Sequence, residues 1–161
     1  MGKFDKLALA VDEPEKMIIV HPHTRQPLRH KESGEEGYIE LYSSDSDIAR
    51  KHSRNIQRRR LNMRGRGKLT PEEIEAEATS LLVALTVSWN LVGLDGDPLD
   101  VPFTQENARE LYSEHVMAWL REQVDEFTAD RSNFSQASST NSSTTQSTNS
   151  ESGAYSTTGQ H

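Results

Sequence analysis

TPEEIEAEATSLLVAL, residues 70–85, is the stretch that decides the fold. Its first turn holds a capping threonine, the proline favoured at the first helical position, and the glutamate that completes a capping box. Apolar side chains then recur at helical spacing, at Ile74, Ala78, Leu81, Leu82, Leu85 and Trp89. The pattern predicts a helix whose apolar stripe is the main core-forming face.

Two short runs upstream of this helix have the character of strands. KMIIVH (residues 16–21) is rich in β-branched residues and is followed by a proline. YIELY (residues 38–42) alternates, so that Ile39 and Leu41 share one face. The polar stretch between the runs reads as a loop or hairpin connection. A small antiparallel sheet or hairpin is therefore expected before the helices.

Helix signals account for most of the remaining folded part. SSDSD (residues 43–47) is dense in N-cap residues, which predicts a helix from about 47 to 63 that stops before the glycines at 65 and 67. Asp95-Gly96 predicts a tight turn. Thr104 caps a further helix, and an apolar stripe over 119–127 marks the last one. The expected class is α+β, with a three- to four-helix segment after the sheet.

Composition divides the chain into three parts. Hydrophobic residues are 33% of the total, and between Ser135 and His161 the only sizeable apolar side chain is Tyr155. A stretch of Ser, Thr, Asn and Gln cannot bury enough surface to offset its conformational entropy. We therefore expect a flexible leader over 1–15, a single α+β domain over 16–134, and a disordered polar tail over 135–161.

Several protein classes are disfavoured by what the sequence lacks. It has no cysteine, which rules out disulfides and thiolate metal sites and fits a reducing compartment. No apolar run approaches the roughly 18 residues that span a bilayer. The first residues lack the apolar stretch of a signal peptide. The cytoplasm is the expected location.

Charge is distributed unevenly along the chain. The segment from Arg50 to Lys68 holds nine of the 18 Lys and Arg residues and no acidic residue. Such a run could neutralise phosphates, so a nucleic-acid-associated regulator is the alternative function. Neither a zinc finger nor an RNP motif accompanies the run, and no aromatic residue is interleaved for base stacking. A solvated or protein-facing helix is the preferred interpretation.

The candidate metal-binding and catalytic motifs in the sequence are weak. His21-Pro22-His23 lacks a third zinc ligand at regular spacing, and the acidic run 95–100 lacks the spacing of a calcium loop. No nucleophile elbow or positioned carboxylate–histidine pair is recognisable. We expect no cofactor, no metal and no enzymatic activity.

Seven ordered segments carry a resemblance to a known family, together with the arginine-rich helix between the first two. They are YIELYSSDS (38–46), KLTPEE (68–73), LTVSW (85–89), DGDP (95–98), PFTQENAR (102–109), WLREQV (119–124) and DRSNF (130–134). From about Met17 to Phe134, the chain resembles the tail assembly chaperones of long-tailed, siphovirus-like phages and prophages. The glycine-flanked basic stretch and the Ser/Thr-rich tail are less typical of that family.

The resemblance implies a function in virion assembly. Such chaperones coat the long, helical, aggregation-prone tape measure protein in the bacterial cytoplasm and leave before the virion is complete. A frameshifted longer product often recruits the tail tube protein. An acidic domain with amphipathic helices suits the masking of apolar helices, and reversible coating requires many copies of modest affinity, with self-association possible. The expected partner-facing residues are Arg58, Arg59, Arg60, Tyr112, Trp119 and Arg121.

Overall fold

The structure is a computed structural model that describes residues 2–63 and 67–134. The predicted helix stop at residues 65–67 lies partly outside the described residues, and the predicted tail 135–161 lies wholly outside them. In chain order the elements are η1 (Asp5–Leu7), β1 (Glu15–Ile18), β2 (Tyr38–Leu41), α1 (Asp47–Asn62), α2 (Pro71–Leu85), β3 (Thr86–Asn90), α3 (Gln105–Ser113), η2 (His115–Met117), α4 (Ala118–Ala129) and η3 (Arg131–Asn133).

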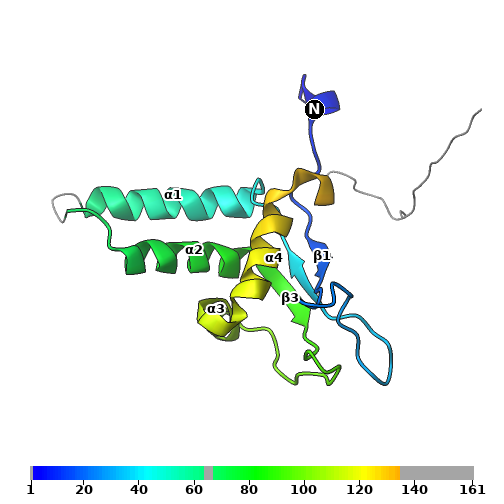
Figure 1. Ribbon diagram of the computed structural model, residues 1–161. Coiled ribbons are helices and arrows are strands. Elements are labelled where there is room, and N and C mark those ends of the chain that lie inside the picture. The colour runs from blue at the N-terminus through cyan, green and yellow to red at the C-terminus, as the bar shows by residue number, and fades with distance from the viewer. Residues whose placement is uncertain (1, 64–66, 135–161) are drawn as a thin grey trace, which may run out of the picture.

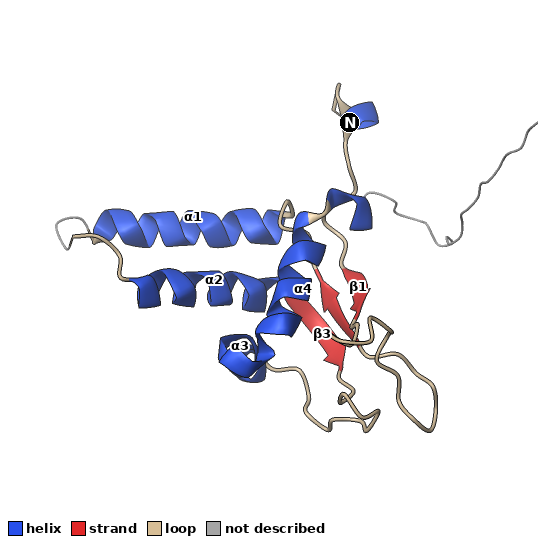
Figure 2. Cartoon of the chain, viewed as in Figure 1, coloured by secondary structure: helices blue, strands red, loops and turns tan. Residues whose placement is uncertain are grey.

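The α+β class is confirmed by a three-stranded antiparallel sheet in the order β1-β2-β3 (Figure 2). Ile18 pairs with Tyr38 across β1 and β2, and Ile39 pairs with Trp89 across β2 and β3. Ile39 and Leu41 are fully buried, as the alternation in β2 predicts. The long connection between β1 and β2 continues as an irregular hairpin, held by the isolated bridges Val20–Pro27 and Arg29–Glu36.

The third strand is a correction to the sequence prediction. We expected the helical period of 70–85 to reach Trp89, but the helix ends at Leu85 and β3 begins at the next residue. TVSWN (residues 86–90) contains β-branched and aromatic residues that favour a strand. Pairing with β2 decides the conformation, because a longer helix would leave the backbone N–H and C=O groups on that edge of β2 without partners.

Helices α1 and α2 form an antiparallel arm that extends away from the sheet (Figure 1). Ser46 caps α1, where its hydroxyl accepts a hydrogen bond from the Ala49 N–H at 3.3 Å. Thr70 caps α2, and the predicted capping box is confirmed. The Glu73 N–H donates to the Thr70 hydroxyl at 3.1 Å, while the Glu73 carboxylate accepts from the Thr70 N–H at 2.8 Å. Local sequence thus fixes where both helices of the arm begin.

Thr70→Ala should lower the free energy of unfolding by about 1 kcal/mol, because it removes the side chain that caps α2. Chemical denaturation followed by circular dichroism measures this change. Thr70→Ser is the matched control, since serine keeps the hydroxyl and should stay close to the parent. Equal midpoints for the alanine variant and the parent would show that the cap does not stabilise the folded chain.

The apolar stripe predicted for α2 is only partly the core-forming face. Ile74 is 54% exposed and Ala78 is exposed. The residues of the helix that are buried are Thr79, Leu82, Val83 and Leu85. The first half of α2 lies in the arm beside α1, beyond the reach of the sheet, so only its last two turns contribute to the core (Figure 1).

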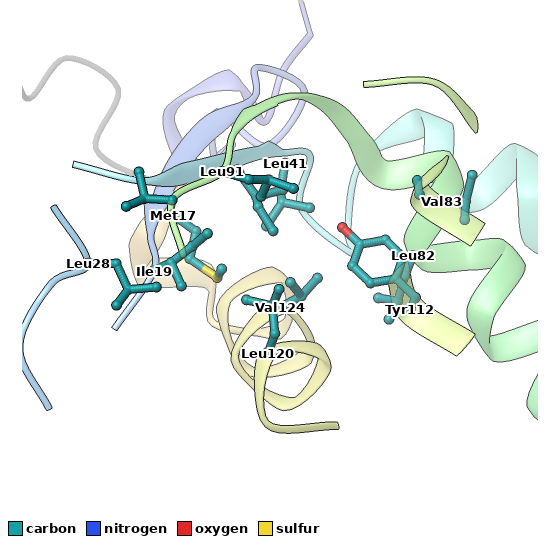
Figure 3. Close-up of a cluster of buried hydrophobic side chains, with 13 residues drawn as sticks. Met17, Ile19, Leu28, Leu41, Leu82, Val83, Leu91, Tyr112, Leu120 and Val124 are labelled. Atoms are coloured by element: carbon teal, nitrogen blue, oxygen red, sulfur yellow. The ribbon is translucent and has the colours of Figure 1, made fainter. Parts of the chain in front are cut away.

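The main core lies between the sheet and the last helices. Met17 and Ile19, from β1 and the residue after it, face Val124 and Leu120 of α4 (Figure 3). Tyr112 of α3 packs beside Leu82 in the same cluster. The single turn η2 separates α3 from α4. α3 begins at the predicted cap, where the Thr104 hydroxyl accepts from the Asn107 N–H at 3.0 Å.

Phe134 closes the described part of the domain. Its ring is buried and meets the Phe127 ring edge to face, with 5.3 Å between ring centroids. The turn η3 brings it back to α4, and Asn133 donates a hydrogen bond to the Phe127 carbonyl at 3.0 Å. The last described residue is therefore a packed aromatic side chain.

Candidate functional site: an apolar groove beside the sheet

An apolar groove of about 280 Å³, which we call the apolar groove throughout, lies where the end of β1, the loop after β3 and the start of α4 meet. Its floor is made by side chains that also belong to the core: Ile19, Leu28, Leu91, Val92 and Leu120. Because the floor residues are packed in the core, the shape of the groove is determined by the fold.

The rim of the groove consists of large apolar side chains that face solvent. Leu94 and Leu99 come from the loop after β3, and Val116, which is 62% exposed, comes from η2. Half-buried Met117 and Trp119 complete the wall on the helical side. An apolar concavity with an apolar rim is suited to receive another apolar surface.

The loop that forms one wall is fixed in place by its turn. The predicted Asp95-Gly96 turn is confirmed: Gly96 has φ +92°, and an added Cβ would meet the Lys31 Cβ at 3.0 Å. Lys31 forms a 2.6 Å ion pair with Asp97, which lowers the pKa of that carboxyl, and its N–H donates to the Gly96 carbonyl at 2.9 Å. The wall is therefore tied to the hairpin that follows β1.

Acidic residues flank the groove in sequence. Asp95 follows Leu94, Asp100 follows Leu99, Glu110 precedes Leu111, and Glu114 lies just before η2. From residue 86 to 130 the only Lys or Arg residues are Arg109 and Arg121. Arg29 follows Leu28 and Arg121 follows Leu120, so the charged neighbours of the lining residues include both signs, with acidic residues in the majority. This balance favours ligands that combine an apolar stripe with positive charge.

Sequence reasoning missed the groove, with the exception of Trp119. The residues around Asp95-Gly96 are predicted to form a turn, and the turn is present. Leucines within a turn segment, such as Leu94 and Leu99, are the signal that could have pointed to it, because a turn alone needs no large apolar side chain.

Tyr112 is buried, which corrects the expectation that it belongs to an exposed surface. Its side chain is 2% exposed, and its hydroxyl lies 2.8 Å from the Thr86 hydroxyl. The Thr86 hydroxyl in turn donates to the Leu82 carbonyl at 2.7 Å, so its oxygen is free to accept from Tyr112. Burial raises the pKa of the phenol to about 12. Tyr112 thus ties α3 to the junction between α2 and β3.

Trp119 and Arg121 lie on opposite sides of α4. Trp119 is half-buried in the wall of the apolar groove. Arg121 is largely buried: its guanidinium donates to the Tyr112 carbonyl at 3.1 Å and forms an ion pair with Glu75 at 2.5 Å. Arg121 therefore joins α4 to α2 and α3.

The predicted basic residues lie on the arm, away from the groove. Arg58, Arg59 and Arg60 are all exposed on α1, and Arg60 forms an ion pair with Glu77 of α2. Arg50, Arg54 and Arg58 recur every four residues and so share one face of the helix. The structure therefore separates the six predicted residues into three exposed arginines on α1, two residues in or near the core (Tyr112 and Arg121), and Trp119 in the groove.

His52 lies between the two helices of the arm. In the described part of the chain its Nε2 is a buried side-chain atom without a hydrogen-bond partner. Burial and the positive charge of Arg59 lower the pKa of His52, against an opposing influence of Glu77. The folded arm thus favours the neutral imidazole.

Stability is expected to fall as the pH drops below about 6.5, the ordinary pKa of histidine, partly because of His52. The unfolded chain takes up the His52 proton first, so protonation favours unfolding until the pH reaches the lowered folded-state pKa. His52→Gln should flatten this part of the profile. Denaturant midpoints measured between pH 7.5 and 5 test it, and parallel profiles for the two proteins would contradict it.

The histidine motif has a structural use. His21 Nδ1 accepts hydrogen bonds from the His23 and Thr24 N–H groups, at 3.0 and 3.3 Å, and so closes a turn. Within residues 2–63 and 67–134, no three side chains of His, Asp or Glu converge as a metal ion would require. None of the helices in these ranges combines the length and the apolar character that crossing a bilayer demands.

Comparisons with protein-family models, curated proteins and solved structures returned no match to this chain. The groove, the arm and their charges are thus the observations on which a function can be proposed.

Proposed function

We propose that this chain is a tail assembly chaperone: a non-enzymatic protein of the bacterial host cytoplasm that binds the tape measure protein, keeps it soluble and leaves before the virion is complete. The observation that carries the proposal is the apolar groove with its exposed rim of Leu94, Leu99 and Val116. The ordered segments of the sequence that resemble such chaperones support it independently. A frameshifted product that contacts the tail tube protein belongs to the same proposal.

The groove suits an amphipathic helix of the tape measure protein. Helix-in-groove recognition inserts apolar residues at i, i+3 and i+4 into a hydrophobic concavity. The floor of the groove accepts those side chains, and Trp119 offers a large surface with little flexibility to lose. Acidic residues around the groove favour a helix with basic flanks. They also give coated complexes like charges, which oppose aggregation.

Co-expression with the tape measure protein of the same phage or prophage tests the proposal. The parent chain should keep the tape measure protein in the soluble fraction. Val116→Glu should return most of it to the pellet, because a charge at the rim repels an apolar helix and Val116 is exposed enough for the variant to fold. Leu61→Glu is the matched control: Leu61 is 64% exposed but lies on the arm, so solubility should be kept. A tape measure protein that is equally insoluble with and without the parent chain refutes the function.

A nucleic-acid-associated regulator is the second candidate, favoured by the shared face of Arg50, Arg54 and Arg58 on α1. A titration with duplex DNA at two salt concentrations separates the candidates, since phosphate contacts weaken steeply with salt. Binding with a steep salt dependence that is lost in an Arg54→Gln/Arg58→Gln variant would favour the regulator.

A further inference from the structure

The first residues of the chain carry an apolar stripe of their own. Phe4, Leu7, Ala8 and Val11 are spaced i, i+3, i+4 and i+7, which is one face of a helix. Phe4 is 69% exposed and Leu7 is 80% exposed. Within the stripe only η1 (Asp5–Leu7) is a helical turn. The leader is thus an amphipathic segment whose apolar face is uncovered.

The basic and acidic residues of this segment lie on opposite sides of its apolar stripe. On a helical projection Lys3 and Lys6 lie on one flank of the stripe, and Asp5 and Asp12 lie on the other. Most of the charged residues next to the groove lining are acidic, although Arg29 and Arg121 are exceptions, so the lysine flank of the leader complements the groove. Among the described residues, an uncovered apolar stripe and an uncovered apolar hollow therefore occur on one molecule with matching charges.

The leader of a given copy is badly placed to fill its own groove. It is held at the start of β1 (Figure 1), where the Asp47 N–H donates to the Asp12 carboxylate at 2.8 Å. The groove includes Ile19, which lies just past the other end of β1. Strand geometry puts Glu15 and Ile19 roughly 13 Å apart. A helix from Phe4 to Asp12 is only about 12 Å long and would have to turn back fully along the strand. A second copy meets no such constraint.

We propose that residues 4–11 of one copy fold as a helix in the apolar groove of a second copy. Because the leader and the groove lie at opposite ends of β1, the contact is heterologous, and each copy still offers a free groove or a free leader. Copies can therefore assemble head to tail into an open linear oligomer. The inference goes beyond the proposed function, because it needs only the groove and the leader, and no tape measure protein.

Peptide binding tests the contact directly. The probe is a fluorescent peptide of residues 2–12, and the receiver is the full chain carrying Phe4→Ser and Leu7→Ser, so that its own leader cannot compete. Saturable binding is expected. Val116→Glu in the receiver should weaken it at least about tenfold, and Leu61→Glu should not. A peptide carrying Leu9→Ser should bind like the parent peptide, because Leu9 lies off the stripe.

Sedimentation velocity at rising concentration tests the assembly. The parent chain should shift to larger species, Phe4→Ser/Leu7→Ser should remain a monomer, and Leu9→Ser should behave like the parent. Absent peptide binding, binding that Val116→Glu leaves unchanged, or a parent chain that is monomeric at every concentration overturns the inference. The proposed function is judged separately by co-expression: a Phe4→Ser/Leu7→Ser chain that keeps the tape measure protein soluble leaves that function standing even if the peptide fails to bind.

Discussion

Tyr112→Ala is expected to lower the free energy of unfolding by about 3–5 kcal/mol, which is the usual cost of deleting a buried aromatic ring. The ring packs with Leu82 in the core, and its hydroxyl meets Thr86 at the junction of α2 and β3. The variant leaves a cavity and removes a hydrogen-bond partner. Denaturant unfolding followed by tryptophan fluorescence and by circular dichroism measures the loss.

Tyr112→Phe is the matched control for the hydroxyl alone. It keeps the ring, so it should cost only about 0.5–1.5 kcal/mol, the net contribution of a typical hydrogen bond. If Tyr112 instead faced a partner, both variants would leave stability nearly unchanged and would affect only binding. A Tyr112→Ala loss below about 1 kcal/mol would therefore contradict the packing described for α3.

Phe134→Ala should be comparably severe, with a loss of about 3–5 kcal/mol. Phe134 is buried against Phe127 although it follows the last helix by several residues. The same measurement applies, and Phe134→Leu should recover much of the loss because it refills the site with an apolar side chain. Phe4→Ala offers a comparison at an exposed aromatic residue and should change stability by no more than about 0.5 kcal/mol. Similar small effects at both phenylalanines would mean that the domain closes before residue 134.

The elements that the sequence predicted well are those defined by local chemistry. The cap at Thr70, the cap at Thr104 and the Asp95-Gly96 turn each need only a few neighbouring residues, and all are present. The alternation around Ile39 also identified the buried face of β2. Such features are decided by backbone groups that find partners within one or two turns of chain.

The features that sequence missed depend on tertiary position. The helical period continues to Trp89, yet pairing with β2 makes 86–90 a strand. Ile74 fits the apolar stripe of α2, yet the arm carries it away from the core. Tyr112 has the amphipathic character of an interface residue, but its hydroxyl partner, Thr86, is 26 residues away in the chain. The apolar groove draws on the chain from Ile19 to Leu120, so no local pattern could define it.

The direct passage from α2 into β3 has a mechanical consequence. Leu85 ends the helix, Thr86 begins the strand, and the Leu85 carbonyl accepts a hydrogen bond from the Tyr42 N–H at 2.8 Å. With no linker residue between them, the arm cannot hinge freely on the sheet. A tilt of the arm must therefore displace β3. Leu91 and Val92, which follow that strand and form part of the groove floor, would move with it.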